Sequence, residues 1–433
     1  MRTPSPGGRH GRIGVALVGA VLGLVTVSGG CSLSGAADEA GAPGVSATEI
    51  DVGSLADVSG PVSADFAPIV DGVKAYFDMV NAAGGVDGRR LVLKYQLDDQ
   101  GIPTQDSDMA RTLVTQDHVF AVVGVGTPFF AAAKYLVQQH TPTFGYQINA
   151  DWGDGPNLFG HNGSNLDTTT MFGTDANLVH QIGGHSVAVL AYGITESKAG
   201  CQLSVNSLEH FGVPVSYQDL AISFGADLSP DALQIKAHHA DVVLSCLDLS
   251  GNIALSRVLQ QNGIGSIRQV WFSGYDRDQL AAYPALMNGV YLLVEHVPFE
   301  ADAAYPGVYP GMHQYLQTMQ RYEPSATYDE VALDGWLNAD LFVTGLRAAG
   351  PHPTQAKVVA AINKITDYNG GGLIPPVDWT VAHFKSPPPS CEAFVQAEQG
   401  RFKPVLGTGS SVFVCTDPTS ATPVPAPPGT PGG

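Results

Sequence analysis

The sequence predicts an α/β protein with two lobes, each built on a doubly wound parallel sheet. Short apolar, β-branched segments alternate along the chain with segments of helical periodicity, which is typical of parallel sheets covered by helices on both faces. The alternation restarts near residue 187. The body of the chain, about residues 47–415, is also too long for one average domain and fits two.

The first predicted helix and strand are joined through a glycine turn. Apolar residues repeat at helical spacing from Phe66 to Val80, and Gly84-Gly85 then ends the helix, because glycine adopts open and left-handed conformations readily. Asp87-Gly88 predicts a tight turn. The alternation of apolar and polar residues from Leu91 to Leu97 predicts a strand, which is followed by Asp98-Asp99-Gln100.

The other elements follow from the same two periodicities. Strands are expected at 50–55, 120–123, 143–146, 187–190, 241–245, 270–272 and 290–294. Helices are expected at 106–116, 128–139 and 250–261, with a helix-rich stretch at 315–365.

The two ends of the chain differ from its body. Residues 1–30 combine an arginine-containing start with a short apolar run and small residues, which predicts a secretory signal. The placement of Cys31 resembles a bacterial lipobox and implies lipidation at the new N-terminus; an ordinary cleaved signal is the alternative. Residues 31–46 read as a flexible tether, and the Pro-rich residues 416–433 as a disordered tail.

Cysteine content and charge agree with export. Apart from Cys31 there are four cysteines, which an oxidising compartment would pair. Of the three connectivities, order and spacing favour Cys201–Cys246 and Cys391–Cys415. The net charge of −19 argues against nucleic-acid binding. The chain has no CxxC motif or Cys/His cluster, so we expect no metal site.

The run from Val80 to Pro103 resembles the first βαβ unit of the branched-chain amino-acid binding proteins of ABC importers. There the stretch commonly reads INAAGGV-GR, followed by an apolar strand and two aspartates. The resemblance implies a type I periplasmic binding protein fold with a multi-stranded hinge that the chain crosses three times. Lobe 1 would then comprise 47–168 plus about 297–365, and lobe 2 would comprise 169–296 plus about 366–415.

Two turns of lobe 1 are candidate ligand sites. Thr127 reads as the N-cap of a helix that starts at Pro128, so the amides of Phe129 and Phe130 would face an anion such as a carboxylate. The family grips its ligand's carboxylate at this turn; a helix cap without ligand is the alternative. The polar residues after the next strand are Tyr146, Gln147 and Asn149. They stand at the position where the family binds the head group of its ligand; incidental loop residues are the alternative.

Lobe 2 offers a second set of candidates. Thr195 and Ser197 follow a strand, and the family often places a ligand-stacking tyrosine in this loop. Tyr275 and Asp276 leave a later strand, where a carboxylate would suit a ligand's ammonium group. An exposed loop aspartate is the alternative for Asp276.

Taken together, these features predict an exported binding protein rather than an enzyme. The chain has no GxSxG, HExxH or P-loop motif, and no cofactor is expected. The resemblance implies a solute-binding lipoprotein on the outer face of the cell membrane. It would capture a small polar ligand (an amino acid, an amide or a small carboxylate, aromatic ones included) and deliver it to an ABC permease, as a monomer. A ligand-sensing lipoprotein that presents solute to a membrane receptor is the alternative.

Overall fold

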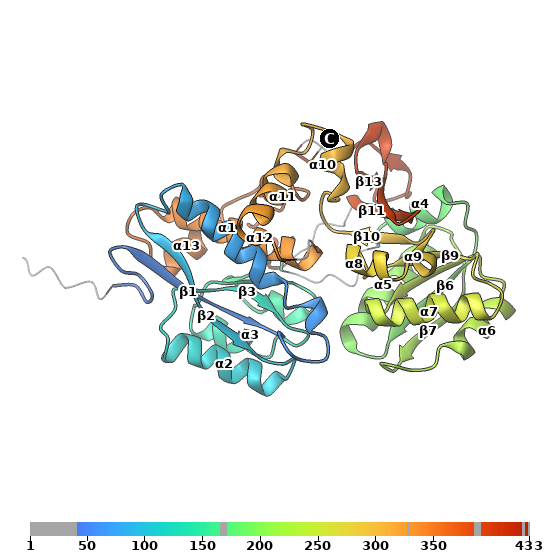
Figure 1. The fold of residues 1–433 in the computed structure, drawn as a ribbon, viewed down its shortest axis with the longest axis horizontal. Helices are drawn as coiled ribbons and strands as arrows, with labels where there is room; N and C mark the ends of the chain where they lie inside the picture. The colour runs from blue at the N-terminus through green and yellow to red at the C-terminus, as the bar shows by residue number, and fades with distance from the viewer. Residues whose placement is uncertain (1–40, 165–170, 327–328, 385–390, 427–428, 432–433) are drawn as a thin grey trace, which may run out of the picture. The chain divides into compact units, whose positions relative to one another are not determined.

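Lobe 1 is built on a five-stranded, wholly parallel sheet. The computed structural model describes residues 41–164, 171–326, 329–384, 391–426 and 429–431. The signal segment, Cys31 and the predicted lobe boundary at 168/169 lie outside these residues. The strand order of the sheet is β2-β1-β3-β4-β5. Figure 1 labels its strands β1, β2 and β3. The strand bounds are β1 (Glu49–Ala56), β2 (Arg90–Asp98), β3 (Ala121–Gly126), β4 (Thr143–Gly145) and β5 (Leu158–Gly160).

The sequence patterns of this lobe correspond closely to its elements. Helix α1 (Ile69–Ala82) buries Val70, Val73, Phe77 and Val80, as the spacing predicts, although Phe66 lies before the helix begins. Gly84 and Gly85 have φ values of 102° and 75°, so both adopt the left-handed backbone that ends the helix. The lobe also contains α2 (Pro103–Thr115), α3 (Ala133–Gln138), and the 3-10 helices η1 (Ser63–Asp65) and η2 (Ala150–Asp154).

A later helix packs on lobe 1 through two glycines. Helix α12 (Glu330–Ala349) crosses α1 and also contacts β3, β4 and α13 (Gln355–Ile362), while α11 (Pro310–Tyr322) packs on α1. A Cβ at Gly72 would lie 1.7 Å from the Ala332 carbonyl oxygen, and one at Gly335 would lie 1.9 Å from that of Ile69. Only glycine fits at this crossing, so the backbones of α1 and α12 approach directly.

Lobe 2 is built on a nine-stranded mixed sheet. Its main order is β14-β13-β11-β10-β9-β8-β6-β7, and β12 pairs with β11. The parallel part consists of β6 (Val187–Tyr192), β7 (Val215–Ile222), β8 (Val242–Cys246), β9 (Arg268–Trp271) and β10 (Tyr291–Val294). The antiparallel part consists of β11 (Cys391–Glu398), β12 (Arg401–Val405), β13 (Phe413–Thr416) and β14 (Pro423–Val424).

The remaining helices belong to this second half of the structure. They are α4 (Thr174–Gln181), α5 (Thr195–His210), α6 (Ser229–Ala237), α7 (Leu249–Gln261), α8 (Arg277–Ala282), α9 (Pro284–Met287) and α10 (Glu300–Ala304), with η3 (Thr408–Ser410) between β12 and β13. Among the described residues, no helix combines the length and apolar character that crossing a bilayer requires.

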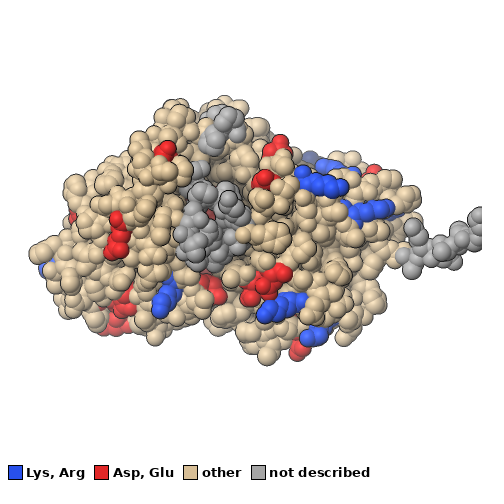
Figure 2. Space-filling view, turned by 180° about the vertical axis from the view of Figure 1, so that it is seen from behind, with Lys and Arg blue, Asp and Glu red and all other residues tan. Residues whose placement is uncertain are grey.

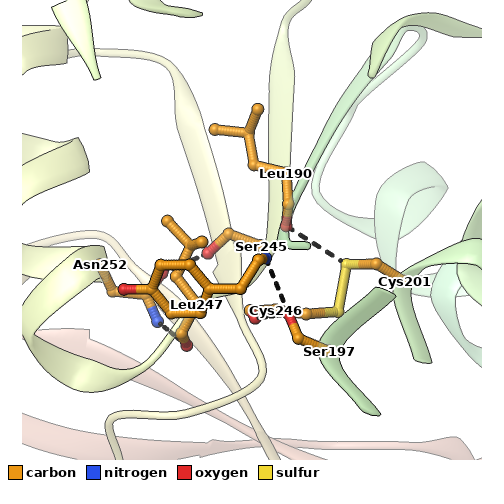
Figure 3. The surroundings of a disulfide bond; sticks show 8 residues. Leu190, Ser197, Cys201, Ser245, Cys246, Leu247 and Asn252 are labelled. Carbon is orange, nitrogen blue, oxygen red and sulfur yellow. Dashed lines mark hydrogen bonds between the residues drawn. A yellow bond between two sulfur atoms is a disulfide. The ribbon is translucent and has the colours of Figure 1, made fainter. Parts of the chain in front are cut away.

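Both disulfides favoured from spacing are present. Cys201–Cys246 ties the buried face of α5 to the end of β8, and Cys391–Cys415 joins neighbouring strands β11 and β13. Figure 3 shows the first of these beside Ser197, whose Oγ donates to the Cys246 carbonyl oxygen at 2.6 Å. The disulfide and this hydrogen bond together hold the first turns of α5 against β8.

The described ends of the chain are more structured than we expected. Val45 pairs with Ile50 in an antiparallel bridge, so the predicted tether already joins the fold before residue 46. The predicted disordered tail also contains strand β14, in which Val424 pairs with Cys415. The tail sequence lacks a core of its own, but the edge of β13 supplies hydrogen-bond partners for it.

Candidate functional site

The candidate site lies where the strands of both sheets end. Loops at the carboxyl ends of parallel strands form the ligand crevice of open α/β folds. In lobe 1 this edge carries Tyr146 after β4 and His161 after β5. In lobe 2 it carries Asp248 after β8, Asp276 after β9 and Glu295 after β10. We call these two edges the rims of the lobes.

Four carboxylates surround Tyr146, and we call Asp65, Glu295, Glu330 and Asp334 the acidic cluster. Burial raises the pKa of the Tyr146 phenol well above its usual value, and all four carboxylates raise it further. Phe66 and Tyr146 are ring neighbours, with centroids 6.1 Å apart. The cluster draws on η1, on the residue after β10 and on the first two turns of α12, so it joins three separate parts of the chain.

Two histidines lie beside carboxylates of this cluster, and one of them, His161, is charged. His161 Nε2 lies 2.5 Å from Glu295 and 3.9 Å from Asp334, and His296 Nε2 lies 3.6 Å from Glu330. Burial alone would lower the pKa of His161, but Asp334 and Glu295 raise it to about 9. His161 is therefore a buried cation, and among the described residues no Lys or Arg forms an ion pair with the cluster.

The rim of lobe 2 combines aromatic rings with carboxylates. Tyr192 donates its hydroxyl to Asp248 at 2.5 Å and stacks on Phe224, with ring centroids 4.1 Å apart. Across the rims, burial raises the pKa of Asp65 to about 6, and repulsion from Asp248 and Asp276 adds to the shift. The two rims face each other, because His161 of lobe 1 lies 2.5 Å from Glu295 of lobe 2.

A cavity of about 660 Å³ lies beside these rims. Lobe 2 contributes Asp276 to its lining, which otherwise comes from lobe 1 and the turn before α12, with Asp71, Lys74, Asp98 and Asp329 as its charged side chains. Figure 2 shows that carboxylate side chains also lie on both sides of the central region of one face. A second cavity, of about 670 Å³, lies between α4 and the C-terminal strands, away from the rims.

Three aspartates at the ends of β1 and β2 converge within 4.8 Å of one another: Asp57, Asp98 and Asp99. Cys and His spacing, from which no metal site is expected, gives no information on these carboxylates. Asp98 Oδ1 accepts from the Val58 amide at 2.9 Å and its Oδ2 accepts from the Ser59 hydroxyl, so this carboxylate is occupied in holding the first loop.

The predicted start of a helix at Pro128, capped by Thr127, is wrong. Helix α3 begins at Ala133, and its capping acceptor is Asp106 of α2, which accepts from the Ala132 amide at 2.6 Å. Thr127 is buried and precedes the helix by a loop, so it does not cap α3. The Phe130 ring is 1% exposed and stacks on Trp152, so it belongs to the core and Phe129 alone is exposed.

Two of the lobe 2 candidates have structural partners instead. Ser197 Oγ accepts from the Tyr192 amide at 2.9 Å and donates to the Cys246 carbonyl oxygen (Figure 3). Tyr275 is buried, donates to Glu300 and accepts from the Phe299 amide. Both side chains therefore hold neighbouring segments of lobe 2 together.

The remaining candidates stay near the rims. Asp276 caps α8 through one oxygen and lines the 660 Å³ cavity. Thr195 is exposed at the start of α5. After β4, Asn149 is buried with neither amide atom hydrogen-bonded, and Gln147 Nε2 also lacks a partner. These unpaired groups follow directly on Tyr146, so the loop after β4 remains a candidate contact surface.

Most residues of the acidic cluster are not recognisable from the sequence. Asp65, His161, Glu330 and Asp334 carry no local motif, since tertiary packing alone brings them together. Glu295 could have been identified as a site residue from the sequence, because it is the first residue after the predicted strand 290–294. Ligands bind at that end of the strand.

Solved structures share this architecture. A fatty acid ABC transporter substrate-binding protein from Thermomonospora curvata superposes with a TM-score of 0.68 at 18% identity, over 90% of this chain and 98% of that one. A solute-binding protein of an ABC transporter from R. palustris, in complex with benzoate, superposes with a TM-score of 0.65 at 15% identity, over 88% and 99% of the two chains. The fold is therefore that of the two-lobed solute-binding proteins.

The chain belongs to the periplasmic binding protein family, whose model matches residues 49–401. A stretch of 79 residues is 35% identical to Leu/Ile/Val-binding protein homolog 3 of Brucella melitensis; it covers 18% of this chain and 21% of that relative. The matched stretch thus spans about a fifth of the length of this curated relative. The family comprises extracytoplasmic solute-binding proteins of transporters rather than enzymes.

Proposed function

We propose that the protein is a solute-binding lipoprotein of an ABC importer, which captures one small polar ligand between its rims and delivers it to a permease. The observation that carries this proposal is the cavity of about 660 Å³ that Asp276 of lobe 2 lines together with residues of lobe 1. A ligand held there would touch both lobes, and lobe closure around it would present a distinct surface to the permease.

Ligand binding is tested by thermal unfolding of purified, ligand-freed protein in the presence of amino acids, amides and aromatic acids. A ligand at one hundred times its Kd stabilises the native state by about 2.7 kcal/mol, which is an upward shift of several degrees. A broad library in which nothing shifts the melting temperature would contradict the proposal.

Lipid anchoring and delivery need separate tests. Cells grown with a radioactive fatty acid should label the wild-type protein and leave the Cys31→Ala variant unlabelled; an unlabelled wild type would refute the anchor. Deletion of the gene should abolish uptake of the ligand found by thermal shift, and complementation should restore it. Unchanged uptake would contradict the transport role.

A further inference from the structure

We propose that the protein binds a calcium ion at the carboxyl ends of β1 and β2, through Asp57, Asp98 and Asp99. The site lies within lobe 1 and does not depend on a ligand held between the lobes. The expectation of no metal site concerned cysteine and histidine ligands. Calcium instead prefers carboxylate and carbonyl oxygens, to which that argument does not apply.

The sheet topology brings the three carboxylates together. Strands β1 and β2 are parallel neighbours, and their last residues, Ala56 and Asp98, are Cα partners. Asp57 and Asp99 therefore leave the sheet side by side, each as the first residue after its strand. One carboxylate oxygen from each of the three aspartates lies within 4.8 Å of the other two. Oxygens bound to one calcium ion at about 2.4 Å can lie up to about 4.8 Å apart, so these three can share an ion.

Asp57 supplies the observation that points to a ligand. Its side chain is 0% exposed, and its Oδ1 accepts from the Gly60 amide at 2.6 Å. Its Oδ2 is buried and has no hydrogen-bond partner. An unpaired carboxylate oxygen is costly in the interior, because burial removes the water that would solvate its charge. A bound cation would supply the partner that this oxygen lacks.

The unpaired oxygen points at the turn that carries the other two carboxylates. Gly101 follows them in that turn with a φ of 66°, and its amide donates to Asp99 Oδ1 at 2.9 Å. A Cβ at Gly101 would lie 3.0 Å from Asp57 Oδ2, which is the nearest atom to that point outside residues 100–102. The glycine therefore leaves an atom-sized space beside the unpaired oxygen.

No basic side chain in the described part of the chain neutralises these three aspartates. The Lys, Arg and His residues that form ion pairs do so with other carboxylates. Lys74 lines the same 660 Å³ cavity as Asp98, but it pairs with Asp71 at 3.7 Å. Neighbouring carboxylates without a counter-ion repel one another, and a divalent cation would relieve that repulsion.

Further oxygens adjoin the three aspartates. The point that a Cβ at Gly60 would occupy lies 2.4 Å from Asp57 Oδ1 and 2.4 Å from the Gln100 carbonyl oxygen, so this carbonyl lies beside the carboxylates. Asp98 Oδ2 accepts from the Ser59 hydroxyl and keeps a lone pair for a metal. Oxygen donors from irregular loops suit calcium, whose coordination is flexible, better than magnesium, which demands a near-ideal octahedron.

The test is a calcium titration of full-length protein with native disulfides, freed of metal by a chelator. Thermal unfolding is followed in CaCl₂, in MgCl₂ and in NaCl at matched ionic strength. We expect calcium to raise the melting temperature by several degrees, because it binds the native state. Calorimetry should give one ion per chain with a Kd of about 1 mM or tighter. Absence of calcium binding, or a shift in magnesium or sodium equal to that in calcium, would overturn the proposal.

Substitutions assign the ion to these residues. Asp57→Asn and Asp99→Asn each remove one charge with little change of shape, so each should weaken calcium binding by about ten-fold or more. Asp78→Asn should leave calcium binding unchanged, because Asp78 is an exposed carboxylate of α1. Circular dichroism checks that each variant is folded. Wild-type calcium affinity in either folded cluster variant would overturn the assignment.

Hydrogen exchange locates the ion without any substitution. The amides of residues 58–60 and of Gly101 donate to oxygens of the three carboxylates. Calcium should therefore slow exchange in these two loops and leave helix α5 of lobe 2 unchanged. Protection by calcium that is confined to other segments would place the ion elsewhere and overturn the proposal.

Discussion

Replacing Asp65 by asparagine should stabilise the ligand-free protein while weakening ligand binding. The carboxylate has a pKa of about 6 in the fold against an ordinary value of 3.8, a difference of roughly two pH units. At 1.36 kcal/mol per unit this is about 3 kcal/mol of destabilisation when the group is ionised. Asp65 is partly exposed, so solvent screening reduces the figure and we expect about 1–2 kcal/mol.

The sign of the pH dependence makes this prediction specific. Because folding raises the pKa of Asp65, the folded state holds its proton more tightly, and the penalty is complete above pH 6 and absent below pH 3.8. Urea unfolding at pH 8 should therefore show the full gain for the variant, and the gain should shrink at pH 5. Asp78→Asn serves as the control. An Asp65→Asn variant that is less stable at pH 8, or whose gain does not change with pH, would refute the reasoning.

Three further predictions test the packing. Gly335→Ala should destabilise the fold by about 3 kcal/mol because its Cβ meets backbone, whereas Gly200→Ala in α5, with nothing within 4 Å, should be neutral or stabilising; equal effects in chemical denaturation would contradict the α1–α12 crossing. Replacing Cys201 and its disulfide partner by alanine should cost about 4 kcal/mol, given their separation of 45 residues, and an unchanged urea midpoint would contradict this. Phe130→Ala should cost about 3–5 kcal/mol and Phe129→Ala little, since Phe130 is buried and Phe129 is 40% exposed; the reverse order in urea unfolding would restore the sequence-based site.

Much of the fold could be predicted from periodicity. The alternation at 91–97 corresponds to β2 (Arg90–Asp98), and the helical pattern at 250–261 corresponds to α7 (Leu249–Gln261). These elements are readable because one face of each is buried, so the core imposes its period on the sequence. The close approach at Gly72 and Gly335 was not predictable, because neither glycine lies at a turn. Each is required because the backbone of the other helix lies where a Cβ would be.

The candidate site was less predictable than the fold. The start of α3 was placed at Pro128 because Thr127-Pro128 is a good local cap, yet the cap comes from Asp106 of a different helix. A tertiary partner of this kind leaves no local signal. Tyr146 and Asp276 could be located because they follow predicted strands, while Glu330 and Asp334 lie within a helix that packs on the other part of the chain.

The central claim, that one ligand is held between two lobes, is tested most directly by calorimetric titration of ligand into wild type, Asp65→Asn and Asp248→Asn. Asp65 belongs to lobe 1 and Asp248 to lobe 2. The account predicts one-to-one stoichiometry for wild type and a loss of affinity of at least ten-fold in each variant. Full affinity in both folded variants would contradict binding between the rims.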